Sequence, residues 1–467
     1  MLTQNKRIPL EEVNFHPMSI MDDAGRLFWY QGLLYRGINR DWAPFYRELI
    51  ERGTIDDLVK KGLLVHTEVS NLKVDNFELV LKHDVLPFVS YPHEWCAEML
   101  RQAALRVLDL EIELRQRGLI LKDSHPWNVL FNHCNPIYVD VGSIVSGDNT
   151  DSDWKVHEEF CRFFWYPLQL MAHDHERMAS LLLQDEQGVL EAEVRLLAPN
   201  GGRSIPAIAR WLMKGCVPVH ARGPLRKVLA CLGITAPMSG TRPDLIRTMR
   251  RQVESLEFPY RKTPWSEYYA SEFPLFVPCE EWTEKHKSMY AILSQTRPHS
   301  VLDIGSNRGW YTQLAAKLGS NVVAFDVDNS SIGKLYDEAR GQNLRILPLK
   351  IDFRSPTPFY FGRHQWAIPT ENRLQCEMVF GLALVHHLVF KQYMNFQQIV
   401  DGLAAFSSKS LVVEFIPRED IFVREWWSDR YSWYTLEEFK KSLYRFYRTI
   451  TTFPSFPEPR LILLCEK

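Results

Sequence analysis

The stretch VLDIGSNRGWYTQLAAKLGSNVVAFDVD, residues 301–328, has the residue types and spacing needed to bind a nucleoside-containing ligand. An apolar strand is expected to end near Asp303, Gly305 then permits a tight turn, and Gly309 is expected to open a helix. A second expected strand ends in Asp326, whose carboxylate can accept hydrogen bonds from both ribose hydroxyls of an adenosine-type ligand. The spacing therefore predicts a binding site across the carboxyl ends of two neighbouring strands.

The same loop argues against a dinucleotide. Its pattern is Asp303-x-Gly305-x-Asn307-x-Gly309, which differs from the Gly-x-Gly-x-x-Gly that places a pyrophosphate on a helix N-terminus. An acidic residue at the start of the loop repels a pyrophosphate, whereas a ligand with a positive charge and an amino-acid ammonium suits it. An NAD-binding domain, or a domain of this kind that binds nothing, is the alternative.

This stretch resembles motif I and the ribose-binding acidic residue of class I S-adenosylmethionine (SAM)-dependent methyltransferases. Asp352 stands where the family places an acidic residue near the adenine amino group, 378–388 resembles the fourth strand and its loop, and 411–417 resembles the fifth strand. TPWSEYY, 263–269, resembles the N-terminal flap of some members. Asn307 replaces the usual middle Gly. The Asp/Asn-Pro-Pro-Tyr motif of amino-methylating enzymes is absent from the fourth strand, which favours an oxygen acceptor over a nitrogen acceptor.

The resemblance implies a set of SAM-binding residues and a smaller set of catalytic candidates. His386 and His387 are candidates because a base helps to remove the proton of a hydroxyl acceptor, and the unperturbed pKa of His suits pH 7. Glu414, at the end of the fifth strand, is a third candidate, and the alternative for all three is a purely structural role. The implied SAM-binding residues are Asp303, Gly305, Ser306, Asn307, Gly309, Asp326, Val327, Asp352 and Phe353.

A second constellation, at 117–145, has a spacing used for phosphoryl transfer. Asn128 follows Asp123 by five residues, and Asp140 opens an Asp-Val-Gly triplet after the next strand. One carboxylate can accept the proton of a hydroxyl, while the Asn and the second Asp hold Mg²⁺ on nucleotide phosphates. The stretch resembles the catalytic loop and metal-binding triplet of protein-kinase-like phosphotransferases. That resemblance implies Asp123 as the base and Asn128 and Asp140 as metal ligands for Mg·ATP.

The other half of a kinase signature is missing from the sequence. Neither a Gly-rich phosphate loop nor a Val-Ala-Ile-Lys strand occurs, and residues 22–57 would have to hold the whole nucleotide-binding lobe. Arg36 and Lys82 are the basic residues of the expected strands, and Arg is not equivalent to Lys for phosphate coordination. His125 stands where many such kinases carry a Lys. We therefore expect a degenerate kinase-like module, with an active kinase as the alternative.

These motifs need an α/β framework to position them. We expect a seven-stranded, mostly parallel Rossmann-like methyltransferase sheet in 261–467, preceded by an α+β kinase-like domain in 1–180 and a helical connector in 181–260. An antiparallel hairpin from 448–452 and 460–465 is expected to close the sheet edge. The other strand candidates are 300–304, 321–325, 344–351, 378–383 and 410–415.

Composition excludes several classes of function. The chain has 55 Lys and Arg against 57 Asp and Glu, a net charge of −2, so it lacks the basic excess of a nucleic-acid-binding protein. Its 8 Cys form no Cys-x-x-Cys pair, which predicts free thiols in a reducing compartment and no zinc site. Neither a signal peptide nor an apolar run of transmembrane length occurs, so we expect a cytoplasmic protein.

The predicted function is SAM-dependent O-methylation of a small molecule or glycan. Two alternatives remain open: a bifunctional kinase–methyltransferase that uses Mg·ATP, and a non-catalytic scaffold that binds SAM. The pairing of domains resembles enzymes that modify the ends of bacterial surface glycans. The whole chain is similar to methyltransferases associated with nodulation, a resemblance that implies glycans or lipo-oligosaccharides as acceptors.

Overall fold

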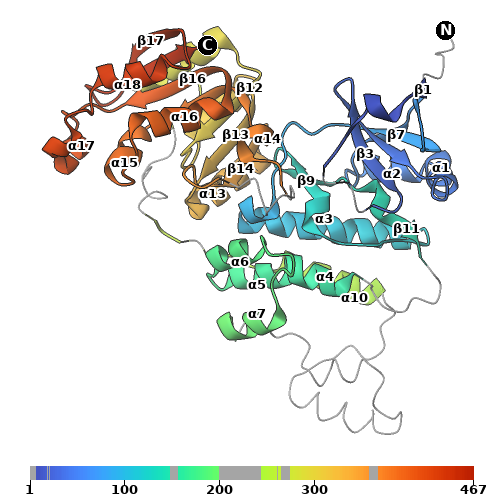
Figure 1. Cartoon of the computed structure of the whole chain (residues 1–467). Helices are drawn as coiled ribbons and strands as arrows, with labels where there is room; N and C mark the ends of the chain where they lie inside the picture. Colours follow the sequence, from blue (N-terminus) through green and yellow to red (C-terminus); the bar gives the residue numbers. More distant parts are fainter. Residues whose placement is uncertain are drawn as a thin grey trace, which may run out of the picture. The chain divides into compact units, whose positions relative to one another are not determined.

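The computed structural model divides into two compact units. Figure 1 shows its helices and strands, coloured along the sequence. Unit 1 comprises Met1–Met99, Leu130–Ile137 and Tyr260–Lys467, and unit 2 comprises Leu100–Val129 and Tyr138–Pro259. The predicted division after residues 180 and 260 stays a prediction. The residues that the structure describes are 7–17, 19, 22–147, 156–198, 243–259, 261–263, 274–356 and 367–467.

The C-terminal part of unit 1 contains a seven-stranded sheet with the strand order β14-β13-β12-β15-β16-β18-β17. The first five strands in this order are parallel, and β18 pairs antiparallel with both β16 and β17. The predicted sheet and its edge hairpin are therefore confirmed. The strands are β12 (Ser300–Ile304), β13 (Asn321–Asp326), β14 (Ile346–Lys350), β15 (Cys376–Gly381), β16 (Ser407–Phe415), β17 (Thr449–Pro454) and β18 (Leu461–Glu466).

Helices connect these strands because neighbouring parallel strands require a crossover. The middle residues of β12 and β13 are mostly apolar and buried, as expected for strands covered on both faces. The carboxyl ends of β12, β13, β14, β15 and β16 consequently meet at one edge. The helices are α11 (Glu284–Thr296), α12 (Trp310–Lys317), α13 (Asn329–Gly341), α14 (Thr370–Arg373), α15 (Val385–Phe390), α16 (Phe396–Phe406), α17 (Ile421–Trp426) and α18 (Leu436–Leu443).

The N-terminal part of unit 1 contains a five-stranded antiparallel sheet with the order β2-β3-β4-β7-β5. The helices α1 (Ala43–Glu51) and α2 (Thr54–Lys60) come between β4 and β5 in the sequence. This sheet extends beyond 22–57, because β2 precedes that range, β7 follows it and pairs with β4, and β5 pairs with β7. The strands are β2 (Asn14–Phe15), β3 (Gly25–Tyr30), β4 (Leu33–Ile38), β5 (Thr67–Val69) and β7 (Leu79–His83), and β1 (Arg7–Ile8) pairs separately with β6 (Lys73–Val74).

A buried ion pair within unit 1 ties the segment that follows β7 to α14. The guanidinium of Arg373 pairs with the carboxylate of Glu94 and donates to the carbonyl oxygen of Val89 at 2.7 Å. The same guanidinium lies 4.1 Å from the ring centroid of Tyr91, whose hydroxyl accepts the N–H of Ile368 at 2.7 Å. Both charged side chains are almost fully buried, so loss of either partner would leave an uncompensated charge.

Unit 2 is mainly helical, with a short antiparallel pair of β8 (Leu119–Leu121) and β11 (Ile144–Ser146). Two helices, α7 (Glu191–Leu197) and α10 (Pro243–Glu254), lie in the predicted helical connector 181–260, of which residues 199–242 lie outside the described residues. Among the residues that the structure describes, no helix is both long and apolar enough to span a membrane. The helices are α3 (Ala97–Arg115, whose first turn belongs to unit 1), α4 (His157–Phe160), α5 (Tyr166–Ala172), α6 (Glu176–Leu182), α7 (Glu191–Leu197) and α10 (Pro243–Glu254).

Candidate functional site

The loop between β12 and α12 has three residues with left-handed backbone conformations. The φ angles of Gly305, Asn307 and Gly309 are 73°, 52° and 75°. Asn is among the non-glycine residues that adopt positive φ most readily, which explains how Asn307 occupies this position. The N–H groups of Gly305 and Ser306 both donate to the carbonyl oxygen of Phe325, at 2.9 and 3.2 Å. The loop therefore curls across the carboxyl end of β13.

Asp326, the last residue of β13, joins two loops. Its Oδ2 accepts the N–H of Asn307 at 2.9 Å, and its Oδ1 accepts the N–H of Asp328 at 2.9 Å. Burial raises the pKa of Asp326, and these backbone bonds oppose that shift. An ionised carboxylate offers about four acceptor positions. Asp326 consequently keeps acceptor capacity for ligand hydroxyls, and the side chain of Val327 beside it is 56% exposed.

Asp303 lies beneath the loop, at the end of β12. Its side chain is 3% exposed, and its Oδ2 accepts the hydroxyl of Thr312 on α12 at 2.6 Å. Burial raises the pKa of Asp303 to about 6, and the nearby charge of Asp326 adds to that shift. The hydroxyl of Ser306 is also buried and has no hydrogen-bond partner among the described residues. The loop thus places an anionic group and an unsatisfied hydroxyl at the same edge of the sheet.

Asp352 follows β14, and Arg354 binds both of its carboxylate oxygens. The Nη2–Oδ2 distance is 2.6 Å and the Nε–Oδ1 distance is 3.0 Å. Burial raises the pKa of this carboxyl, but the hydrogen bonds and charge of Arg354 outweigh it and hold the pKa below its usual value. Arg354 would therefore have to share or release Asp352 for that carboxylate to contact an adenine.

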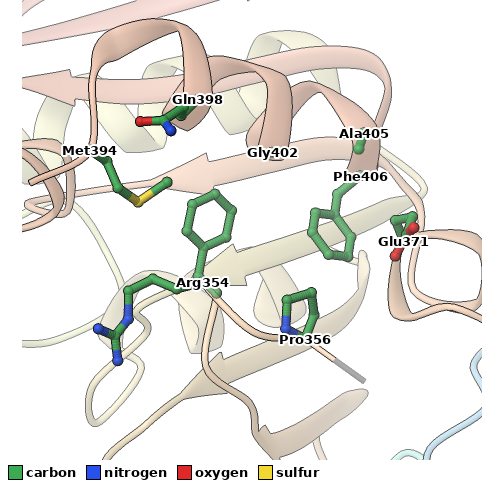
Figure 2. A pocket seen from close by; sticks show the side chains of 9 residues that line it. Arg354, Pro356, Glu371, Met394, Gln398, Gly402, Ala405 and Phe406 are labelled. Atoms are coloured by element: carbon green, nitrogen blue, oxygen red, sulfur yellow. The ribbon is translucent and has the colours of Figure 1, made fainter. Parts of the chain in front are cut away.

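Phe353 comes directly after Asp352 and packs against a helix. Its ring packs against α16, where a Cβ on Gly402 would stand 2.7 Å from it. Phe353 lines a pocket of about 300 Å³ to which neither 303–309 nor Asp326 contributes (Figure 2). The other lining residues are Arg354, Pro356, Glu371, Met394, Gln398, Gly402, Ala405 and Phe406.

Glu414, near the carboxyl end of β16, is fully buried and joins three segments. Its Oε2 accepts the ammonium of Lys285 on α11 at 2.6 Å and the N–H of Ala383 at 2.8 Å. Its Oε1 accepts the hydroxyl of Ser455, which follows β17, at 2.6 Å. Ala383 has a φ of 50°, so this contact also holds a strained turn between β15 and α15. The arrangement suits Glu414 to positioning this turn.

His386 and His387 lie on α15, directly after that turn. Their ring centroids are 4.1 Å apart, and the ring of His386 is within 10° of parallel to Trp426. Burial lowers the pKa of His386 well below its ordinary value and that of His387 to about 4. The Nδ1 of His386 is buried without a hydrogen-bond partner among the described residues. Both rings are therefore neutral at pH 7, and burial makes each a weaker base than a free imidazole.

The aromatic side chains that follow β16 mainly pack in the protein interior. Tyr431 and Tyr434 are buried against Phe390, and the hydroxyl of Tyr434 donates to the carbonyl oxygen of Ile416 at 2.9 Å. Trp426 differs, because it stacks on the histidine pair.

The predicted N-terminal flap is described only at its first residue. The hydroxyl of Thr263 donates to the carboxylate of Asp328, next to the Asp326 loop. The remainder of 263–269 lies outside the described residues.

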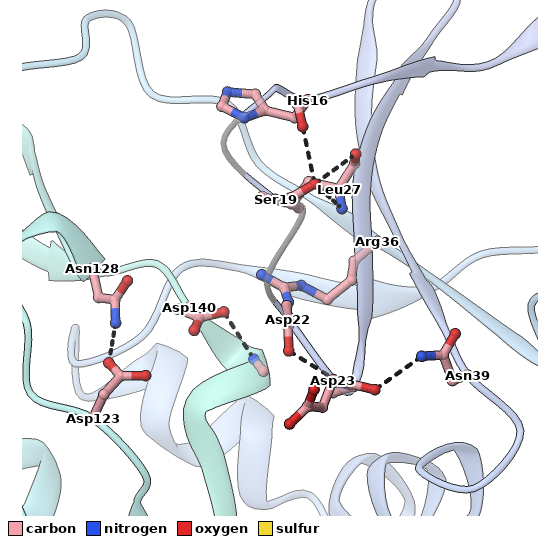
Figure 3. Close-up of polar contacts among 12 residues, drawn as sticks. His16, Ser19, Asp22, Asp23, Leu27, Arg36, Asn39, Asp123, Asn128 and Asp140 are labelled. Carbon is pink, nitrogen blue, oxygen red and sulfur yellow. Dashed lines mark hydrogen bonds and ion pairs between the residues drawn. The ribbon is translucent and has the colours of Figure 1, made fainter. Parts of the chain in front are cut away.

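The second predicted constellation lies in unit 2. The side-chain amide of Asn128 donates to the carboxylate of Asp123, and Asp140 accepts the N–H of Gly142 at 3.1 Å (Figure 3). Burial raises the pKa of Asp123 to about 6, with further contributions from Asp140 and Glu159. Asp123 is thus a carboxyl group that can exchange a proton near neutral pH.

The basic residues predicted for a phosphate site have carboxylate partners within unit 1. Arg36 on β4 is 4% exposed and pairs with Asp22 (Figure 3), whereas Lys82 is paired with Glu68 at the surface. In unit 2, His125 packs 4.1 Å from Phe163, and burial lowers the pKa of His125 to about 4. Within the described part of the chain, no three His, Cys, Asp or Glu side chains are grouped closely enough to hold a metal ion.

Lys285, Ala383 and Ser455 were not predicted as site residues. Lys285 and Ser455 lie outside the recognised motifs, Ala383 lies within 378–388, and only the sheet topology brings all three to Glu414. No local sequence signal could have identified them.

The loop geometry predicts that Gly309→Ala is more destabilising than Gly319→Ala. Both residues have positive φ, but a Cβ at Gly309 would stand 2.8 Å from Leu335, whereas a Cβ at Gly319 would meet no atom within 4 Å. Overpacking should cost Gly309→Ala about 1–2 kcal/mol beyond the shared backbone strain. Thermal unfolding of both variants measures the difference. Equal midpoints would show that α13 does not constrain this turn.

The chain is similar to a known protein over nearly its whole length. The chain is 25% identical over 442 residues to nodulation protein NoeA of Rhizobium meliloti (strain 1021), a match that covers 91% of this chain and 90% of that protein. No protein-family model matches the sequence.

The chain is also similar to solved structures, over shorter parts of its length. The bifunctional kinase-methyltransferase WbdD is 16% identical with a TM-score of 0.30, over 46% of this chain and 45% of that chain. Magnesium protoporphyrin IX methyltransferase (ChlM) of Synechocystis PCC 6803, solved with bound SAM, is 14% identical with a TM-score of 0.28, over 39% and 77%. The chain therefore spans less than half the length of WbdD. The strand order matches the expected seven-stranded, mostly parallel, methyltransferase-like sheet, and the chain resembles a nodulation protein over nearly its whole length.

Proposed function

We propose that this chain is a SAM-dependent methyltransferase that O-methylates a small-molecule or glycan acceptor. The observation that carries the proposal is the carboxylate of Asp326, which lies at the carboxyl end of β13 and gathers the N–H groups of Asn307 and Asp328. A carboxylate in this place can accept both hydroxyls of a ribose. The glycan class of acceptor rests on the resemblance of the whole chain to methyltransferases associated with nodulation, and the similarity to NoeA, a nodulation protein, agrees with that resemblance.

The residues around Asp326 fit the remaining parts of SAM. Asp303 offers a buried anionic group for the ammonium of the amino-acid end, and the orphaned hydroxyl of Ser306 offers a hydrogen-bond group beside it. The exposed apolar side chain of Val327 suits the face of an adenine ring. Asp352 is the proposed partner of the adenine amino group. Phe353 contacts the neighbouring pocket, so its contribution would be indirect.

The protein's own chemical contribution is deprotonation and alignment of the acceptor. SAM supplies the methyl group on a sulfonium leaving group, so little further activation is needed. Neutral His386 can accept the proton of an acceptor hydroxyl, and His387 can assist or replace it. Glu414 positions both rings through Ala383 at the turn before α15.

Methyl transfer from isotope-labelled SAM into a fractionated extract of the source cell tests this proposal. We expect label in the small-molecule or glycan fraction for the parent protein. His386→Asn should lower transfer by about 10²–10⁴-fold, because it removes the proposed base, while SAM binding should change little. Asp326→Ala should abolish both binding and transfer. Lys409→Met, at an exposed ion pair, serves as the control.

Three outcomes would contradict the proposal at different points. Label in protein or RNA would keep the methyltransferase and exclude the proposed acceptor. SAM binding without transfer into any fraction would favour the non-catalytic scaffold. Unchanged SAM affinity in Asp326→Ala would exclude the proposed pocket.

SAM affinity should fall as the pH drops through about 6. In the ligand-free protein Asp303 has a pKa of about 6, so acid converts its carboxylate to the neutral form, which no longer attracts a cation. Binding of cationic SAM should lower that pKa, and affinity should therefore be full near pH 7 and roughly three- to tenfold weaker at pH 5. Calorimetric titration between pH 5 and 7 measures this dependence. The matched variant Asp303→Asn, which can still accept the Thr312 hydroxyl, should remove it, and an unchanged profile would exclude Asp303.

We also infer that the N-terminal part is a kinase-like module that has lost phosphotransfer. The contact between Asn128 and Asp123 and the position of Asp140 support the resemblance. The buried pair of Arg36 with Asp22, and the neutral His125, support loss of activity. Mg·ATP should accordingly leave the thermal midpoint unchanged. A rise that Asp140→Ala removes would favour the bifunctional enzyme instead.

A further inference from the structure

Lys285 carries a cationic group at the carboxyl edge of the seven-stranded sheet. It is the second residue of α11, and its side chain is 13% exposed. Its Nζ lies 2.6 Å from Oε2 of Glu414 and 5.2 Å from the ring centroid of Tyr311, at the start of α12. The ammonium is therefore held between the end of β16 and the helix that follows the Asp303–Gly309 loop.

The hydrogen bonds of Lys285 leave donors for a ligand. An ammonium has three N–H groups, and within the described ranges the carboxylate of Glu414 is its hydrogen-bond acceptor. Glu414 itself accepts from three donors, so its role in holding Lys285 does not depend on a ligand. A second acceptor with negative charge would satisfy the remaining N–H groups of Lys285.

The amino-acid end of SAM carries such an acceptor. It has an ammonium, which suits Asp303, and a carboxylate, which requires a cation close to Asp303. Lys285 is close to this region, since its ammonium lies 5.2 Å from the ring centroid of Tyr311, and the next residue, Thr312, donates its hydroxyl to Asp303 at 2.6 Å. Arg308, the cation of the loop itself, is directed to Glu338 on α13 at 3.1 Å.

We propose that Lys285 binds the carboxylate of the methionine portion of SAM, while Glu414 holds the ammonium of Lys285 in place. This assignment rests on the proposed function. It makes the pocket complementary to both charges of the amino-acid end, with Asp303 and Lys285 as the two partners. Glu414 then acts twice, through Lys285 on the cofactor and through Ala383 on the histidine pair.

A pair of ligands that differ only in the carboxylate tests the assignment. Dissociation constants of SAM and decarboxylated SAM are measured by calorimetry on the full chain. The parent protein should bind SAM at least about tenfold more tightly, because a charge-assisted hydrogen bond is lost with decarboxylated SAM. Lys285→Met should weaken SAM to the level of decarboxylated SAM and leave the latter nearly unchanged. Lys287→Met, at an exposed site on the same helix, should behave as the parent does.

Different failures would be distinguishable. Equal affinity of the parent for both ligands, or equal weakening of both by Lys285→Met, would overturn the role of Lys285 and leave the proposed function intact. Binding of neither ligand by the parent would overturn the proposed function. If Lys285→Met leaves Glu414 buried and unpaired and fails to fold, the double variant Lys285→Met/Glu414→Gln removes that charge and gives the same comparison.

Discussion

The N–H groups of Asn307 and Asp328 converge on one carboxylate, that of Asp326, and the geometry of the candidate site depends on this convergence. A buried carboxylate is costly unless it is hydrogen-bonded. The two backbone donors offset that cost, and they fix the loops that follow β12 and β13 against each other. Three residues with positive φ, at 305, 307 and 309, permit the first loop to approach closely enough.

Glu414, near the carboxyl end of β16, gathers hydrogen-bond donors in a similar way. It is fully buried and takes one donor each from α11, from the turn before α15 and from the segment after β17. Two carboxylates therefore organise the carboxyl ends of β12, β13, β15 and β16. Two carboxylates suffice because the strands are parallel. Their carboxyl ends meet at one edge, and the turns that follow them can carry polar groups.

The motif around Asp303 and Asp326 could be predicted because it is local. Strand, turn, helix and second strand all fall within 301–328, and each is signalled by apolar runs and glycines. The contacts of Glu414 could not be predicted, since Lys285 precedes it by 129 residues and Ser455 follows it by 41. Only the strand order brings those segments together.

The same distinction applies to the N-terminal sheet and to the packing of Phe353. The N-terminal sheet extends beyond 22–57 because β7 pairs with β4, and β5 with β7, from a distance in the sequence. The ring of Phe353 packs against α16, which the absence of a side chain at Gly402 permits. Neither pairing nor packing of this kind leaves a signal in the local sequence.

In the proposed complex, SAM occupies the carboxyl edge between β12 and β13. A crystal structure of the full chain with S-adenosylhomocysteine tests this placement most directly. Both ribose hydroxyls should lie within about 2.5–3.2 Å of the carboxylate oxygens of Asp326, with the amino-acid end between Asp303 and Lys285. Ligand bound elsewhere, or a ribose that makes no contact with Asp326, would contradict it.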